Sequence, residues 1–600
     1  MDRVIDGAII IVDEAHNLDG DCRDAASLIL DPAKVDLTLE QLAEFKRELQ
    51  GGARSRKRGA INNKFQKGAG LSGFKGDSMT SEALEVCVKA ADELIEFNLK
   101  VQCWLDNFAT THRCSKTRQL NAAPIAESLA TGVSHRADVS TLRKKLKEMR
   151  AGLIDLGVES EAVKSVAIND SEAVLSRFEL LLNDGGPHYT GWYTLPDPDH
   201  GNGGRDGNGR GGRGGGRGGR GSIRSSSTAK RTPAPRGVLS LLCWSGSVAF
   251  EPVAKRSSSV LLTSGTLQPM HLLQTEFFGT AAVPGQSTGL QLEAQSPASD
   301  KLEAKSKADQ PDTLDRRTFL QFSAPHFPGV SDNLTTLFVS EAAVPPPHPV
   351  GVPTQVSLLG NYEQRFDPSY LRALGMAIVQ VAHVVPAGML VYFPSTAVLQ
   401  NAIQTWRAPC GVRGDEPSIC QQLEATKRVF VEPIKATADE FDARLSEYKM
   451  AAEAPGEAGG GPSGAVLLAV LRGRSSEGLN FSHDAARAVV MVSIAFPPIH
   501  DIKVASKRSR SSGSEWYTGQ AFKAANQAIG RLIRNPSDYG VLVLLDRRFA
   551  TPTMRGLLPG WVQNARRQWH ARTVAEMAPG LAAVSTFFAQ KRAHGGRLAS

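Results

Sequence analysis

The chain has 600 residues, which is enough for several domains that each bury a hydrophobic core. Hydrophobic residues make up 41% and charged residues 22%, which excludes a chain that is disordered or membrane-embedded throughout. The formal net charge of +8 is compatible with a polyanionic partner, although over this length it can also serve solubility alone.

The first element predicted in chain order is a buried strand. Residues 7–12 read Gly-Ala-Ile-Ile-Ile-Val, a continuous apolar run typical of a strand buried on both faces of a parallel sheet. Asp13, Glu14 and His16 follow at once. They therefore lie at the carboxyl end of the strand, where open α/β sheets bind their ligands.

The middle of the chain changes character twice. Residues 31–183 are mostly helical in pattern, with helices predicted at 38–50, 81–104, 140–156 and 171–182. Residues 184–236 are rich in Gly, Arg and Ser, and this composition predicts a disordered linker. Its Arg-Gly-Gly repeats could bind nucleic acid, but a tolerated insertion is favoured because long loops cost little.

The remainder predicts an α/β fold. Strand-like runs alternate with helical stretches, as expected for parallel sheets with connecting helices. The runs lie at residues 259–262, 389–393, 429–431, 465–471, 488–494 and 540–545. Flexible inserts are predicted around residues 291–312, 344–353, 454–464 and 507–513.

Cysteine usage and hydropathy restrict the cellular setting. The seven cysteines are scattered without a CxxC pair, which favours a reducing intracellular compartment, and Cys243 is predicted to be a buried thiol. No apolar run approaches the roughly 20 residues that span a bilayer, so no membrane partner is predicted. Residues 54–58 (Arg-Ser-Arg-Lys-Arg) fit either a nuclear localisation patch or a solvated charge run.

The acidic motif DEAH at residues 13–16 suits phosphoryl chemistry. Asp13 could hold the Mg²⁺ that bridges two phosphates of ATP, and Glu14 could orient or deprotonate the attacking water. The alternative is an acidic loop that merely follows a strand, because four residues make a weak signal.

A second motif, QAIGRLIR at residues 527–534, supplies two arginines. Arg531 and Arg534 are three apart, so on a helix they would share a face and could reach one phosphate. A planar guanidinium suits contact with a γ-phosphate. The alternative is a surface helix with ordinary arginines.

Between these motifs lie three further strand-and-turn segments in a fixed order. They are TSGTL at residues 263–267, FPS at 393–395 and RGRSSEGLNF at 472–481. The complete set resembles the iron-sulfur family of superfamily-two DNA helicases. That group includes the xeroderma pigmentosum group D and Fanconi anaemia group J helicases and the regulator of telomere elongation helicase. Segments at residues 238–244, 515–517 and 558–562 are most similar to the last of these.

The resemblance implies a domain plan with two RecA-like motor domains and ATP bound between them. The first motor, incomplete here, would comprise residues 1–30 and 237–275. A helical Arch-like insertion would occupy 31–183, the linker 184–236, and the second motor 276–600. The expected activity is ATP-dependent 5'-to-3' translocation on single-stranded or branched DNA in the nucleus, by a monomer, in repair, recombination control or telomere maintenance. Repair or replication proteins are possible partners.

The resemblance also implies the residue roles. Asp13, Glu14 and His16 would belong to the catalytic acidic motif, with Asp13 on Mg²⁺. Gln527, Gly530, Arg531 and Arg534 would serve the nucleotide. Ser264, Thr266, Glu477 and Gly478 would couple hydrolysis to strand movement.

Three departures from the family pattern affect these expectations. The 600 residues contain neither a GxxxxGK[ST] phosphate-binding loop nor a four-cysteine cluster, so the 4Fe-4S ligands expected in the full-length protein are absent here. Asn480 and Asn535 replace the usual Asp and His. We therefore expect an amino-terminally truncated helicase that is inactive by itself. The alternative is a catalytically inactive DNA- or protein-binding fragment.

Overall fold

The computed structural model describes most of the chain in two compact units. The first unit comprises Met1–Thr263 and Pro498–Gly513, and the second comprises Ser264–Pro497 and Ser514–Ser600. The described residues are 5–58, 81–112, 117–155, 166–195, 236–264, 267, 270–278, 329–344, 354–410, 416–454, 462–476, 479, 481, 483–510 and 512–595.

The acidic motif follows a short parallel strand pair. Strand β1 (Ile9–Val12) pairs in parallel with β6 (Ser259–Leu262), which precedes the TSGTL motif. Ile9 and Ile11 are 69% and 66% exposed. The prediction of burial on both faces is therefore wrong. Alternate side chains point to opposite faces of a strand, and one face of this pair is not covered by the described part of the chain.

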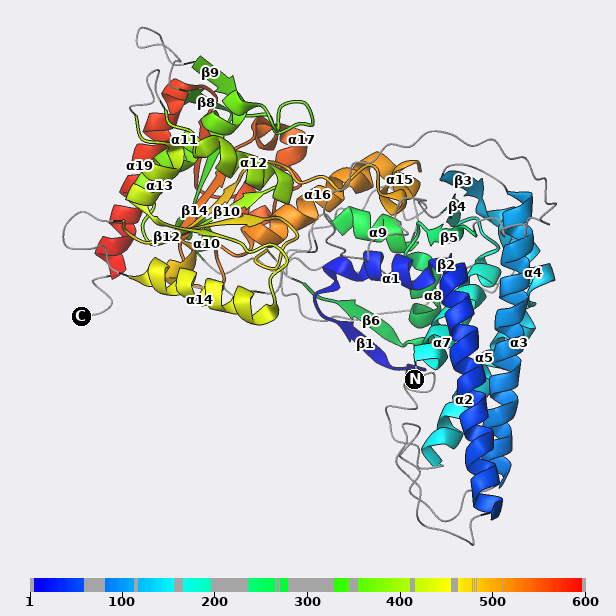
Figure 1. Ribbon diagram of the computed structural model, residues 1–600. Coiled ribbons are helices and arrows are strands. Elements are labelled where there is room, and N and C mark those ends of the chain that lie inside the picture. Colours follow the sequence, from blue (N-terminus) through cyan, green and yellow to red (C-terminus); the bar gives the residue numbers. More distant parts are fainter. Residues whose placement is uncertain are drawn as a thin grey trace, which may run out of the picture. The chain divides into compact units, whose positions relative to one another are not determined.

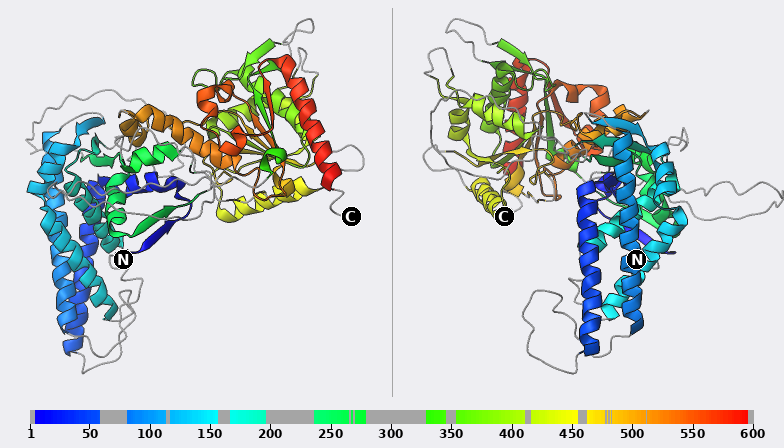
Figure 2. Two further views of the ribbon diagram at one scale, coloured as in Figure 1. Left: turned by 180° about the vertical axis from the view of Figure 1, so that it is seen from behind. Right: turned by 45° about the vertical axis from the view of Figure 1, so that its right-hand side comes forward.

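The region predicted to be a helical insertion, residues 31–183, contains long helices, as expected, and also β3 (Arg118–Asn121), one strand of a four-stranded sheet. Helices α2, α3 and α5 lie side by side (Figures 1 and 2). The described helices of this unit before residue 263 are η1 (Ala15–Asn17), α1 (Leu18–Ala26), α2 (Pro32–Arg58), α3 (Ser81–Thr111), α4 (Ala122–Gly132), α5 (Arg136–Asp155), α7 (Val166–Asp184) and α8 (Ser247–Arg256). The antiparallel sheet has the order β2-β5-β4-β3, with β2 (Leu28–Leu30), β3 (Arg118–Asn121), β4 (Tyr189–Thr194) and β5 (Val238–Cys243).

Strand β4 corrects the predicted linker at residues 184–236. Tyr189 and Tyr193 are 3% and 2% exposed, and the Tyr189 hydroxyl donates to the Ala26 carbonyl oxygen at 3.1 Å. This stretch of aromatic and β-branched residues has strand propensity that the composition of the whole segment concealed. Residues 196–235 of the predicted linker lie outside the described residues.

The predicted return to the first motor at residues 237–275 is also revised. Strand β5 pairs with β2 and β4 of the antiparallel sheet, whereas β6 is the strand that pairs with β1 among the described residues. Helix α9 (Met270–Phe278) belongs to the second unit, because His271 forms an ion pair with Glu515 at 2.9 Å and Leu272 packs on Gly519.

A segment predicted to lie in the second motor belongs to the first unit. It carries α15 (Ile502–Arg508), and we call residues 498–513 the strap. Trp192 Nε1 donates to Ser506 Oγ at 2.6 Å, and Lys507 Nζ donates to the Trp244 carbonyl oxygen at 2.6 Å. Lys507 is 4% exposed, so the flexible insert predicted at 507–513 is wrong at its start, where the chain is fixed by these contacts.

The second unit is a parallel α/β sheet of seven strands, which confirms the predicted fold class. Its order is β11-β12-β10-β13-β14-β7-β15. The strands are β7 (Leu334–Val339), β10 (Gly388–Phe393), β11 (Arg428–Val431), β12 (Ala465–Val470), β13 (Ala488–Met491), β14 (Gly540–Leu544) and β15 (Arg567–Ala571). A hairpin of β8 (Glu341–Val344) and β9 (Thr354–Ser357) accompanies it.

Helices cover both faces of this sheet (Figure 1). Within β10, Val391 and Phe393 join one hydrophobic core while Leu390 and Tyr392 join the other, because alternate side chains face opposite sides. Besides α9, the described helices of this unit are α10 (Val330–Asn333), α11 (Pro368–Val384), α12 (Thr396–Trp406), α13 (Ile419–Thr426), α14 (Ala438–Glu453), η3 (His483–Ala486), α16 (Gly513–Ile529), η4 (Arg547–Ala550), α17 (Pro552–Arg555), α18 (Gly560–Gln563) and α19 (Val574–Gly595). Among the described residues, no helix combines the length and apolar character needed to cross a bilayer.

Candidate functional site

The acidic motif forms a tight turn after β1. Thr263 Oγ1 donates to Asp13 Oδ1 at 2.7 Å, and the Glu14 backbone N–H donates to the same oxygen at 2.9 Å. These two hydrogen bonds stabilise the carboxylate and lower the pKa of Asp13 below its ordinary value. The structure therefore brings the first residue of the TSGTL motif, 250 positions away in the sequence, onto the acidic motif.

The rest of the turn positions the second carboxylate. Glu14 has a positive φ of 49°, and its side chain is 70% exposed. His16 Nδ1 lies 3.1 Å from Glu14 Oε2, and the imidazole is largely buried. The three predicted residues Asp13, Glu14 and His16 are thus adjacent, with Glu14 held between the turn and the imidazole.

This acidic turn fits Mg²⁺ of the kind that ATP brings with it. Mg²⁺ in such sites is held by one or two carboxylates together with phosphate oxygens and water. Asp13 is exposed and stabilised as an anion, which suits that role. Within the described part of the chain, no group of three or more His, Cys, Asp or Glu side chains could hold a metal by itself.

In the second unit, the loop after β12 is ordered by a buried carboxylate. Glu432, 9% exposed, accepts hydrogen bonds from the backbone N–H groups of Val470 at 2.9 Å and Ser475 at 3.1 Å. The Tyr392 hydroxyl donates to the Ser475 carbonyl oxygen at 3.1 Å. The RGRSS part of the predicted motif is therefore fixed to the neighbouring strands β10 and β11.

The two motif arginines converge on the same loop. Arg531 Nη2 donates to the Ser476 carbonyl oxygen at 3.0 Å, and its Nη1 donates to the Leu479 carbonyl oxygen. Arg534 Nη2 donates to that same Leu479 oxygen at 3.1 Å. The expected convergence of Arg531 and Arg534 is thus present, although Arg531 is buried at 7% exposure and Arg534 is exposed.

The reason given for this convergence, a shared helix face, is wrong. Helix α16 ends at Ile529, and Gly530 begins a turn. A buried carboxylate holds the turn instead, because Asp538 Oδ2 accepts from the backbone N–H groups of Arg534 at 3.0 Å and Asn535 at 2.9 Å. Gln527 lies on the last turn of α16 and is half-buried.

Some predicted residues cannot be placed. Thr266, Glu477 and Gly478 lie outside the described residues, as does Asn480. Ser264 is described and begins the second unit.

Sequence reasoning missed Glu432 and Asp538. Asp13 was identified as an acidic residue that follows a predicted strand. Glu432 follows the strand-like run at residues 429–431, so the same signal could have identified Glu432. Asp538 had no local signal, since its partners belong to a turn that was expected to be helical.

The sequence is similar to those of known helicases. Residues 378–565 match the family described as helicase C-terminal domain. The regulator of telomere elongation helicase 1 of Mus musculus is 29% identical over 581 residues, which cover 93% of this chain and 40% of that protein. The Homo sapiens protein of the same name is 35% identical over 250 residues, 39% of this chain and 19% of that protein. This chain therefore spans less than half the length of either relative.

Solved structures titled XPD helicase and XPD apo also match. The match to the first covers 94% of this chain and 68% of that structure's chain, at 12% sequence identity and a TM-score of 0.36. The match to the second covers 94% of this chain and 76% of that structure's chain, at 13% sequence identity and a TM-score of 0.37.

Proposed function

We propose that this chain, a homologue of the regulators of telomere elongation helicase with a helicase C-terminal domain, is part of an ATP-dependent DNA helicase of genome maintenance. The complete protein would hydrolyse ATP with Mg²⁺ and move 5'-to-3' on single-stranded DNA in the nucleus. Its roles would lie in repair, recombination control or telomere maintenance.

The observation that carries the proposal is the meeting of Arg531 and Arg534 at the Leu479 carbonyl oxygen. Two guanidinium groups beside one loop form a concentrated positive charge, which suits an anion such as a phosphate. Water weakens the attraction between a guanidinium and a phosphate. Because Arg531 is buried, its attraction to a bound phosphate would be stronger than that of an exposed arginine. Two of its contacts here are to carbonyl oxygens, and phosphate oxygens would be stronger acceptors.

The acidic turn would supply the complementary chemistry. Asp13, stabilised as an anion by Thr263, would hold Mg²⁺, whose charge would stabilise the phosphates when bound. Glu14, exposed and next to His16, would orient the attacking water. The Thr263 contact would let the TSGTL segment respond to changes at Asp13. Ser264, Thr266, Glu477 and Gly478 remain proposed coupling residues.

The proposal is tested in a longer protein that joins these 600 residues to a GxxxxGK[ST] loop. Steady-state ATP hydrolysis with single-stranded DNA should fall by roughly 10³-fold or more in Arg534→Ala, because an arginine that stabilises transferred phosphate contributes about 10³ to 10⁵ in rate. DNA affinity at fixed salt should change little, since many other cations share the phosphate contacts.

Arg566→Ala is the matched control. Arg566 is a second exposed arginine of the same unit, with its side chain 70% exposed and paired to Asp332 at 2.9 Å. Normal hydrolysis in Arg534→Ala together with lost DNA binding would place Arg534 in the nucleic-acid groove and refute its proposed role.

A further inference from the structure

Aromatic rings and guanidinium groups lie in two groups on the second unit. The Arg365 guanidinium carbon lies 4.5 Å from the Tyr362 ring centroid and 4.9 Å from that of Phe366. Arg548 lies 5.7 Å from the centroid of Phe496, which stacks on Tyr517 with centroids 5.2 Å apart and planes inclined by 23°. We call these six residues the aromatic–arginine row.

The row stands at the carboxyl ends of three neighbouring strands. Ser493 lies two residues beyond the end of β13, and Asp546 lies two residues beyond the end of β14. The Leu358 N–H donates to the carbonyl oxygen of Ser340, the residue after β7, at 2.8 Å. Since open α/β sheets bind ligands outside the carboxyl ends of their strands, this edge is a favourable place for a binding surface.

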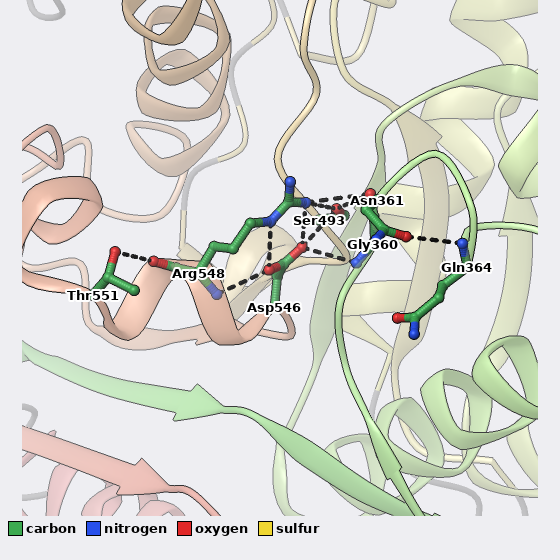
Figure 3. A network of polar contacts seen from close by, with 7 residues as sticks. All are labelled: Gly360, Asn361, Gln364, Ser493, Asp546, Arg548 and Thr551. Carbon is green, nitrogen blue, oxygen red and sulfur yellow. Dashed lines mark hydrogen bonds and ion pairs between the residues drawn. The ribbon is translucent and has the colours of Figure 1, made fainter.

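A buried polar network connects Arg548 of the row to Gly360, in the loop that leads to Tyr362 (Figure 3). Asp546, 1% exposed, accepts from Ser493 Oγ at 2.8 Å, from the Gly360 N–H at 3.2 Å and from Arg548 Nη2 at 2.7 Å. Arg548 Nη2 also donates to the Gly360 carbonyl oxygen at 3.3 Å. The loop that carries Tyr362 is therefore fixed to the sheet next to Arg548.

Gly360 is required for this close approach. A Cβ at this position would collide with Ser493 Oγ and would lie 2.6 Å from Ser493 Cβ. The loop backbone thus lies directly against the sheet edge, which holds the following residues in place while their side chains remain accessible. Tyr362 is 73% exposed and Phe366 is 41% exposed.

The exposed rings are more than scattered surface hydrophobics. Single exposed apolar residues are common in proteins, but here two rings share one guanidinium on a loop anchored by a buried carboxylate. Arg365 forms no ion pair with any residue that the structure describes, so its charge is available to an anion. Arg547, exposed in the adjoining turn, adds a second cation.

We propose that the aromatic–arginine row binds single-stranded DNA by stacking bases on Tyr362 and Phe366 while Arg365 contacts the phosphate backbone. Rings that accept any base and cations that follow the backbone are the features by which proteins bind single strands without sequence preference. Phe496 and Tyr517 would extend the path beyond Arg548. The inference rests on the proposed function, because it names where the DNA lies on the second unit.

Binding by the 600-residue chain tests the row without ATP hydrolysis. Fluorescence anisotropy at one fixed salt concentration compares two labelled probes, an oligothymidylate of about 20 nucleotides and an abasic deoxyribose-phosphate strand of equal length. Wild type should prefer the oligothymidylate. Tyr362→Ala and Phe366→Ala should each weaken its binding by about tenfold, the loss expected from one base–aromatic stack, and leave the abasic probe unchanged.

Two variants serve as controls. Tyr362→Phe keeps the ring and should bind like wild type. Trp569→Ala removes an aromatic residue of β15 that is also 41% exposed but lies outside the row, and it should not affect either probe. A strand carrying 5-iodouracil should crosslink to the peptide containing Tyr362 and Phe366, which tests the contact in the unmutated protein.

The outcomes separate this inference from the proposed function. The proposal that the row binds DNA would be refuted if both alanine variants bound oligothymidylate with wild-type affinity. It would also be refuted if crosslinks formed only to peptides outside the row. Either result would favour a protein ligand for the row. Equal loss of both probes would also overturn base stacking. Absence of binding to either probe by wild type would refute the proposed DNA function itself.

Discussion

Replacing Glu432 should disorder the loop that receives the motif arginines. Its carboxylate accepts two backbone hydrogen bonds, at 2.9 and 3.1 Å, in a site that is 9% exposed. A hydrogen bond to a charged group contributes about 1.5 to 3 kcal/mol, and an unsatisfied buried donor costs a similar amount. Glu432→Gln keeps one acceptor and should therefore cost about 2 to 3 kcal/mol. Glu432→Ala removes both and should cost about 3 to 5 kcal/mol.

Hydrogen exchange provides a local measurement of this loss. The backbone N–H groups of Val470 and Ser475 should exchange roughly 30- to 150-fold faster in Glu432→Gln, the factor that corresponds to about 2 to 3 kcal/mol when exchange follows local opening. The urea midpoint of the second unit should fall as well.

Glu447→Gln is the matched control, because Glu447 is 58% exposed and pairs only with Arg444 among the described residues. Loss of a surface pair changes stability by about 0.5 kcal/mol or less. The assignment of Glu432 as the residue that orders the loop would be refuted if Glu432→Gln and Glu447→Gln had the same amide exchange rates and the same urea midpoint.

Three further predictions follow from other buried groups and from the motif set. Burial lowers the pKa of Lys427 from 10.5 to about 8, so between these values the unfolded chain binds more protons and stability rises with pH. The difference in free energy of unfolding between wild type and Lys427→Met should therefore change in favour of wild type by up to about 1.4 kcal/mol per pH unit from pH 8 to 10. A difference that stays constant over this pH range would contradict the prediction. Asp538→Ala, which leaves three backbone N–H groups without their acceptor, should cost about 3 kcal/mol by urea titration, whereas Asp442→Ala at an exposed site of α14 should cost less than about 0.5. The 600 residues alone, which lack a GxxxxGK[ST] sequence, should hydrolyse no more ATP than their Glu14→Gln variant, and measurable extra turnover would disprove this.

Strand ends were the most predictable part of the site. An apolar run followed by acidic or hydroxyl residues indicated where Asp13 and Thr263 would lie, and the parallel pairing of β1 with β6 brings them together. The same alternation of strands and helices predicted the parallel sheet of the second unit. These features depend on local sequence and on the rule that parallel strands share a carboxyl edge.

Hydrogen-bond and core partners that the local pattern did not reveal decided the features that sequence reasoning missed. Strand β4 was assigned to a linker because its neighbours are rich in Gly and Arg, although Tyr189 and Tyr193 are core residues. The arginine turn was expected to be helical because its spacing permits a helix, yet Asp538 stabilises a turn after Gly530. The partners of β4 lie on strands far away in the sequence, whereas Asp538 acts on residues only three and four positions away.

The strap has a practical consequence for dividing the protein into fragments. Because residues 498–513 belong to the first unit, the chain passes from one unit to the other three times, after Thr263, after Pro497 and after Gly513. A fragment that stops at Thr263 would expose Trp192 and Trp244 and leave the Trp192 indole without its Ser506 partner. Such a fragment should aggregate or express poorly. A better design would append the strap to residue 263 through a flexible tether, and would replace residues 498–513 by a short linker when the second unit is produced alone.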